Sequence, residues 1–140
     1  MKKARLLAVS VMAAVLLLVS GCSIYGPPGK ELGEEFSLAI GDSVEIKGQD
    51  LQIELVEVIE DSRCPSGAEC IWQGRVSVKV KIVYQRDSYE MVLIQYGLYE
   101  GYDVESYQDY LFTFKVEPYP ELNKKIRDSE YRLLIKVSQR

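Results

Sequence analysis

Apolar and polar positions alternate with a period of two along most of the chain after residue 35. Successive side chains of a strand point to opposite faces, so this period predicts half-buried β-strands rather than helices. The alternation is found in residues 36–40, 44–46, 51–58, 76–84, 89–93, 110–114 and 131–137. About seven short strands separated by polar turns indicate an all-β domain, either an antiparallel β-sandwich or a small barrel.

Two details of the pattern predict local geometry. The apolar parity changes from Leu55 to Val56 and Val58, which indicates a β-bulge or a strand buried on both faces. A polar turn at residues 85–88 joins two alternating segments and predicts a hairpin. Residues 121–130 are compatible with a short helix, and no other stretch shows a convincing helical period.

The chain begins with a pattern typical of an export signal. Lys2, Lys3 and Arg5 precede an almost continuous apolar run of residues 6–19. A positive start followed by such a run predicts a secretory signal peptide over residues 1–21. A permanent transmembrane helix is the alternative, but crossing a bilayer takes about 20 apolar residues and this run is shorter.

The residues that follow this run resemble a known processing motif. Val19, Ser20, Gly21 and Cys22 resemble the lipobox of bacterial lipoproteins, in which the cysteine is linked to diacylglycerol and becomes the acylated N-terminus. The resemblance implies that Cys22 carries the lipid, palmitate included, and anchors the domain on the extracytoplasmic side of the cell membrane or outer membrane. Ser23 replaces the aspartate associated with inner-membrane retention, which favours the outer membrane where one exists.

The segment after the lipid site is rich in glycine and proline. Residues 22–34 contain three glycines and two prolines, a composition that resists helix and sheet and predicts a flexible tether. The chain from Cys22 onward has 119 residues, enough for one core and too few for two. We therefore expect a single β-sandwich domain over residues 35–140.

Removal of the signal peptide makes the protein more acidic. The signal contains three of the 17 basic residues and none of the 21 acidic ones, which leaves 14 against 21 and a net charge of −7. Nucleic acids and anionic lipid head groups are recognised by clustered Lys and Arg. We expect no nucleic-acid partner, and a membrane contact made by the lipid on Cys22.

Cys64 and Cys70 remain once the lipidated cysteine is set aside. An exported protein meets oxidising conditions, so this pair predicts a disulfide, which would contribute on the order of 2 kcal/mol for so short a loop. The chain has no histidine, so a structural zinc site lacks ligands. Free thiols or a redox pair are the alternatives, although the spacing differs from that of thioredoxin-like centres.

A dense run of unusual residues surrounds the two cysteines. It consists of Glu60, Asp61, Ser62, Arg63, Cys64, Pro65, a short turn, Cys70, Ile71, Trp72, Gln73 and Gly74. This order resembles a signature of uncharacterised bacterial secreted proteins and lipoproteins, which also have a Tyr–Pro element before a final strand, as at Tyr119 and Pro120. The resemblance implies the fold and the location, and it implies no activity.

Two interpretations of this run are open. As a recognition surface, a rigid loop would present Arg63 and Trp72, residue types that dominate binding hot spots. As scaffold, Trp72 would lie against the disulfide and Arg63 would bind a carboxylate such as Asp61, or carbonyl oxygens. Gly74 would then permit a sharp turn into the next strand.

Half of the ten tyrosines fall in one segment that predicts a long connection. They are Tyr96, Tyr99, Tyr102, Tyr107 and Tyr110. Tyrosine offers a large amphipathic area at low entropic cost, so the first four are candidate contacts for a protein or glycan. Alternatively some rings cap the core, or the interleaved carboxylates bind calcium, although no EF-hand spacing is present.

Catalytic chemistry has few residues to draw on. Without histidine there is no ordinary Ser-His-Asp triad, and bridged cysteines provide no thiol nucleophile. Carboxylate pairs such as Glu60 with Asp61, or Glu100 with Asp103, are weak candidates for a glycosidase because an acidic chain produces them by chance. We expect no enzymatic activity, cofactor or metal, but a binding module for an envelope protein or glycan, with a structural or assembly accessory as the alternative.

Overall fold

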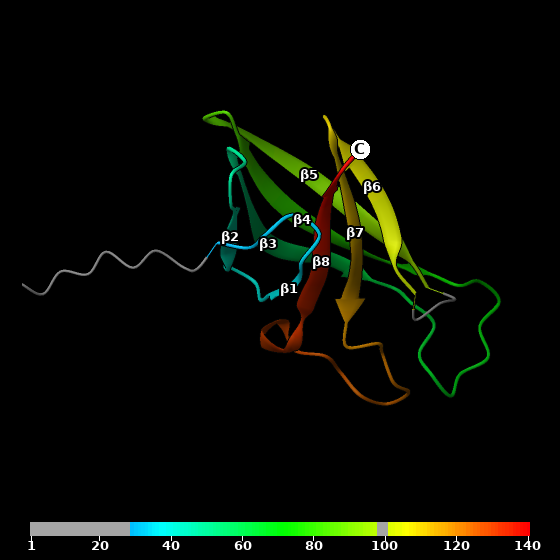
Figure 1. The fold of residues 1–140 in the computed structure, drawn as a ribbon. Helices are drawn as coiled ribbons and strands as arrows, with labels where there is room; N and C mark the ends of the chain where they lie inside the picture. Colours follow the sequence, from blue (N-terminus) through cyan, green and yellow to red (C-terminus); the bar gives the residue numbers. More distant parts are fainter. Residues whose placement is uncertain (1–28, 98–100) are drawn as a thin grey trace, which may run out of the picture.

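A computed structural model describes residues 29–97 and 101–140. The strands are β1 (Glu35–Leu38), β2 (Ser43–Ile46), β3 (Leu51–Asp61), β4 (Arg75–Tyr84), β5 (Asp87–Tyr96), β6 (Asp103–Tyr107), β7 (Tyr110–Glu117) and β8 (Arg132–Gln139). They form two four-stranded antiparallel sheets with the orders β2-β3-β4-β5 and β1-β8-β7-β6 (Figure 1). The predicted sandwich is confirmed, with eight strands instead of about seven, and the sheets do not close into a barrel.

The core lies between the two sheets and is built by alternate residues of the strands. The largest fully buried side chains include Leu38, Ile46, Leu51, Ile53, Leu55, Ile82, Leu93, Phe112, Phe114, Leu133 and Ile135. Each aliphatic or phenylalanine side chain of this kind contributes about 1.5–3 kcal/mol when it leaves water. The face predicted by the alternation is therefore the face that holds the two layers together.

Both local predictions for the first sheet are confirmed. The pairing of β3 with β4 shifts register between Leu55 and Glu57, and again between Val58 and Glu60, so the parity change marks a bulged strand. The β4–β5 hairpin turns at two residues with positive φ, Gln85 at 50° and Arg86 at 73°. Two left-handed residues make a type I′ turn, whose twist matches that of the flanking strands.

The chain contacts the sandwich before β1 begins. The Lys30 N–H donates to the Glu45 carbonyl oxygen at 2.8 Å, and the Lys30 carbonyl accepts from the Lys47 N–H at 2.9 Å. The Gly33 N–H donates to the Val137 carbonyl of β8 at 2.7 Å. These contacts fall within residues 22–34, the predicted tether, so the last residues of that segment lie against the domain. The predicted signal peptide and lipidation site lie outside the described residues.

Three connections meet at one end of the sandwich (Figure 1). They are the β3–β4 loop (residues 62–74), the beginning of the β5–β6 connection at Gly97, and the β7–β8 loop (residues 118–131). The β7–β8 loop contains the turn of 3-10 helix Asp128–Glu130, which is all that forms of the short helix considered for residues 121–130. This end carries the motif singled out in the sequence.

Candidate functional site

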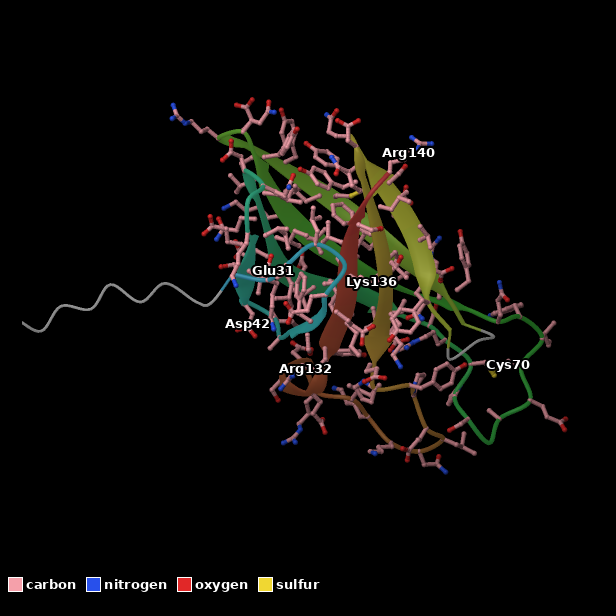
Figure 2. The ribbon with its side chains drawn as sticks, in the orientation of Figure 1. Glu31, Asp42, Cys70, Arg132, Lys136 and Arg140 are labelled. Carbon is pink, nitrogen blue, oxygen red and sulfur yellow. A yellow bond between two sulfur atoms is a disulfide. The ribbon has the colours of Figure 1, made fainter. Side chains whose placement is uncertain are left out.

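A disulfide closes the β3–β4 loop. Cys64 and Cys70 are joined with their Cα atoms 6.0 Å apart, which confirms the predicted bridge. Between them the Ala68 N–H donates to the Pro65 carbonyl oxygen at 3.1 Å and forms a tight turn. Figure 2 shows Cys70 on this loop, well away from the C-terminal Arg140.

The two arms of the loop approach each other closely at its base. Gly74 has a φ of +66°, and a Cβ atom at this position would lie 1.7 Å from the Ser62 carbonyl oxygen. The Ser62 N–H donates to the Arg75 carbonyl at 2.8 Å, and the Cys64 N–H donates to the Gln73 carbonyl at 3.1 Å. The sharp turn expected at Gly74 is confirmed, and the base of the loop is held independently of the disulfide.

Arg63 lies inside the domain, with 2% of its side chain exposed. Its Nε and Nη2 donate to the two carboxylate oxygens of Asp61 at 2.8 and 2.6 Å. Nη1 also donates to the Val116 carbonyl at 2.8 Å, and Nη2 to the Pro118 carbonyl at 2.9 Å. Tyr131 donates from its hydroxyl to Asp61 Oδ2 at 3.1 Å, and burial, reinforced by the Asp61 charge, raises the pKa of Tyr131 to about 12. Arg63 therefore has almost no surface to present to a partner.

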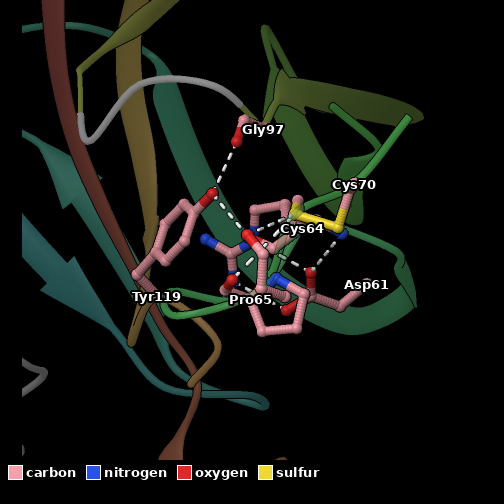
Figure 3. Close-up of a disulfide and its surroundings, with 8 residues drawn as sticks. Asp61, Cys64, Pro65, Cys70, Gly97 and Tyr119 are labelled. Atoms are coloured by element: carbon pink, nitrogen blue, oxygen red, sulfur yellow. Dashed lines mark hydrogen bonds and ion pairs between the residues drawn. A yellow bond between two sulfur atoms is a disulfide. The ribbon is translucent and has the colours of Figure 1, made fainter. Parts of the chain in front are cut away.

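Tyr119 covers this ion pair from the β7–β8 loop. The centroid of its ring lies 5.2 Å from the guanidinium carbon of Arg63, within cation–π range. Its hydroxyl faces the carbonyl oxygens of Cys64 and Gly97, at 2.9 and 2.5 Å (Figure 3). The loop hub is the name we give to Asp61, Arg63, Tyr119 and Tyr131. It fastens all three connections to one another.

Gln95 extends the same arrangement between the sheets. Its side chain is buried, its Nε2 donates to the Gly101 carbonyl at 2.7 Å, and its Oε1 accepts from the Val116 N–H at 2.8 Å. Gly97 follows closely, and a Cβ atom there would lie 2.3 Å from the Gln73 carbonyl oxygen. Sequence reasoning missed both residues. The available signal was that Gln95 lies two residues after Leu93 on β5 and therefore on the same, core-facing side of the strand.

Three large apolar side chains are exposed at this end. Ile71 and Trp72 follow the disulfide and are 95% and 75% exposed, and we call this pair the loop tip. The scaffold interpretation expected Trp72 to lie against the disulfide, but most of its side chain is exposed to solvent. Leu122 of the β7–β8 loop is 52% exposed, and its N–H donates to the Ser66 carbonyl at 3.1 Å, so it lies beside the β3–β4 loop.

The tyrosine-rich segment is not the single long connection that its composition predicts. Tyr96 ends β5, Tyr107 ends β6 and Tyr110 begins β7, so a strand fills the middle of the segment. Tyr99 lies outside the described residues. The expectation failed because β6 is an exposed edge strand whose residues Asp103 and Glu105 interrupt any apolar alternation.

The described tyrosines of this segment have different surroundings. Tyr96 and Tyr102 are about half exposed, and the Lys115 ammonium lies 5.4 Å from the centroid of the Tyr102 ring. Tyr107 packs edge-on against Tyr84 with ring centroids 6.4 Å apart, and Tyr110 is buried in the core. The Tyr107 hydroxyl is buried without a hydrogen-bond partner among the described residues. Two of the rings thus pack at the sandwich interior, and two remain available on the surface.

Neither the carboxylates nor the cleft beside Arg63 forms a second site. Asp61 is held by Arg63, and Glu60 is paired with Arg75. An open cleft of about 710 Å³ lies beside Arg63, and its lining includes Lys115, Glu117, Lys124, Glu130 and Arg132. Lys115 is paired with Glu117 inside the cleft, and Glu130 is paired with Arg127 next to it, so these charges are already neutralised.

The described part of the chain has no group of three or more Asp, Glu, Cys or His side chains that could hold a metal ion. Over residues 29–97 and 101–140 no helix has the length and apolar character needed to cross a membrane. Comparison with known proteins returns no matching family model, no matching curated protein and no matching solved structure.

Proposed function

We propose that this protein is a lipoprotein anchored through Cys22 on the extracytoplasmic side of the cell membrane or outer membrane, and that its sandwich is a non-catalytic module that binds an envelope protein or glycan. The observation that carries the proposal is the loop tip. Ile71 is almost fully exposed and Trp72 is three-quarters exposed, although the loop beneath them is closed by a disulfide and fixed at its base.

The physical reason lies in the combination of exposure and rigidity. Large apolar side chains that stay in water lose the stabilisation that burial provides, about 1.5–3 kcal/mol for an isoleucine. A loop that is already ordered loses little conformational entropy when a partner covers it. Tryptophan in such a setting is among the commonest binding hot spots, where truncation costs about 2 kcal/mol or more. The loop tip has both properties, whereas the buried Arg63 serves to hold it in place.

The carboxylate contacts support a non-catalytic function. A glycosidase needs one carboxyl group that carries a proton and a second that stays ionised. Glu60 and Asp61 each accept hydrogen bonds from an arginine instead. Asp103 accepts from the Tyr96 backbone N–H at 3.1 Å, so it is engaged in holding the end of β5.

A structural or assembly accessory is the second candidate, and the loop hub is compatible with it. Three connections fastened from within suit a passive spacer as well as a binding platform. The two candidates differ in what the loop tip does: a spacer tolerates polar replacements of Ile71 and Trp72, and a binding module loses its partner.

The test uses the full chain in intact cells, with chemical cross-linking, affinity capture and mass spectrometry. The variant I71S/W72A removes the loop tip, and Val104→Ser is the control because Val104 is apolar, 59% exposed and lies on β6. A partner captured by the parent and by the control, and lost with I71S/W72A, is the expected result. The same set is incubated with purified envelope polysaccharide, which gives the corresponding result for a glycan. Equal binding by all three proteins in both assays would refute the binding module.

The anchor is tested separately by growing the same cells with an alkyne-tagged palmitate. Replacement of Cys22 by serine removes the sulfur to which diacylglycerol would be attached, so the tag is expected on the parent protein and not on Cys22→Ser. A parent protein that carries no tag would refute the lipid anchor and leave the binding module untouched.

A further inference from the structure

The sandwich has four edge strands, and they differ in how well they are protected. An edge presents unpaired N–H and C=O groups, and natural proteins shorten, cover or cap such edges. β1 and β2 have four residues each and β6 has five. β2 is also covered by Lys30, and on β6 the Ser106 N–H donates to the Glu105 carboxylate at 3.1 Å. β5 has ten residues and is the longest edge strand.

The turn geometry identifies which groups of β5 point outward. Asp87 pairs with Tyr84 across a two-residue turn, so the backbone groups of Asp87 and of every second residue after it face β4. The backbone groups that face the open side belong to Ser88, Glu90, Val92, Ile94 and Tyr96. The Tyr96 N–H is already capped by Asp103. The other four have no backbone partner among the described residues.

We propose that the β5 edge, from Ser88 to Ile94, receives an extended segment of a partner protein as an additional strand. Only an extended chain offers donors and acceptors at the spacing of a strand, and main-chain hydrogen bonds then supply the affinity. The Asp103 cap at one end and the Gln85–Arg86 turn at the other limit the free edge to these residues.

The side chains along the edge define the chemistry of the partner segment. Glu90 is exposed and forms no ion pair among the described residues, because its cross-strand neighbour Lys81 is paired with Glu54. Val92 is 44% exposed and Ile94 is half-buried. Opposite charges and β-branched pairs stabilise neighbouring strands. The partner segment therefore carries Lys or Arg beside Glu90 and apolar residues beside Val92 and Ile94.

A second copy of this chain fits the edge less well. The domain is strongly acidic, and an antiparallel pair of β5 strands would bring the two Glu90 side chains into diagonal proximity. The β5 site is also separate from the loop tip, so the two proposals fail or succeed independently. Capture of a protein that requires Ile71 and Trp72 would not test binding at the β5 edge.

Hydrogen exchange of the isotope-labelled full chain, followed by NMR in detergent, tests the proposal. The probe is a short synthetic peptide in which one lysine and two valines occupy every second position, with threonine between them, so that all three can lie on the face of Glu90, Val92 and Ile94. The amides of Ser88, Glu90, Val92 and Ile94 are expected to exchange quickly in the protein alone and about tenfold more slowly with excess peptide. A control peptide that is N-methylated at two adjacent central amides, which blocks both of its edges, is expected to give no protection.

Two variants separate strand addition from other binding. Val92→Pro removes an outward N–H and no bond to β4, a placement that edge strands tolerate, and is expected to abolish the protection by the peptide. Glu90→Lys keeps the backbone intact. It is expected to weaken binding of the valine–lysine peptide and to strengthen binding of a peptide in which glutamate replaces the lysine. Unchanged exchange at the four amides in excess peptide would overturn the proposal. The proposal would also be overturned if the four amides exchanged slowly without peptide and the protein sedimented as a dimer. That result would assign the edge to a second copy of the chain.

Discussion

The ring of Tyr119 lies over the guanidinium of Arg63, with its centroid 5.2 Å from the central carbon. The two residues are 56 positions apart in the chain and come from different loops. Because Arg63 also bonds to carbonyl oxygens at the end of β7, this one side chain joins the two sheets at the end that carries the loop tip. The rigidity of the exposed surface therefore originates in buried polar contacts beneath it.

Replacing Arg63 by leucine leaves the Asp61 carboxylate buried without its partner. Removing one member of a buried ion pair costs about 3–5 kcal/mol, so the free energy of unfolding of the full chain is expected to fall by that amount in a urea titration. Arg75→Leu is the matched control, because its pair with Glu60 is about half exposed and screened by solvent, so a much smaller loss is expected there. Equal losses in the two variants would contradict the importance of the loop hub.

Gly74→Ala tests the close approach at the base of the β3–β4 loop. The added methyl group would meet the Ser62 carbonyl oxygen in a backbone conformation that already disfavours alanine, so we expect a loss of about 3 kcal/mol or more. Gly48→Ala provides the comparison, since its φ is +72° but its surroundings are open. There the strain alone should cost about 1–2 kcal/mol. The interpretation fails if the two substitutions prove equally mild in thermal unfolding.

The raised pKa of Tyr131 predicts a loss of stability in alkali. Its value in the folded state is about 12, against about 10 for an unperturbed tyrosine. The folded state therefore holds this proton more tightly, and its contribution to stability is complete below about pH 10 and disappears as the pH rises towards about 12. Urea titrations across this range should show a weaker alkaline decline for Tyr131→Phe than for the parent. If the parent and Tyr131→Phe lost stability equally with rising pH, the alkaline decline could not be attributed to Tyr131.

The disulfide is expected to stabilise the loop locally. The double variant C64S/C70S should lower the free energy of unfolding by about 2 kcal/mol, the value expected for so short a closed loop. The β-sheet circular dichroism should be retained, because backbone bonds and Arg63 hold the base of the loop without the bridge. A variant that loses its sheet signal in the absence of urea would show that the bridge is required for folding.

The sequence predicted most of the fold because the core-facing residues repeat with a strict period of two. The bulge after Leu55 was visible for the same reason, since one extra residue reverses the parity. β6 could not be predicted in this way. Its central residues face water and the Glu105 carboxylate occupies one N–H of its edge, so its strand geometry follows from pairing with β7 and not from its own composition.

The candidate site was predictable only in part. The spacing of Cys64 and Cys70 indicated the bridge, and Gly74 indicated the sharp turn. The burial of Arg63 had no local signal, because the carbonyl oxygens that receive its hydrogen bonds belong to Val116 and Pro118, more than 50 positions later. Contacts of this kind depend on how the two sheets stack, which a pattern within one strand does not encode.

The hydrogen bonds around Lys30 have a mechanical consequence. Lys30 pairs in parallel with β2 and is bonded to Glu45 on it and to Lys47 directly after it, so tension applied from the N-terminal side acts along the strand axis. Bonds loaded in this direction resist together, in shear, whereas the end of a hairpin opens one bond at a time. The hydrogen bond from Gly33 to Val137 of β8 transmits part of this force to the second sheet. A pull on the N-terminal side is thus distributed over both layers before it reaches β1.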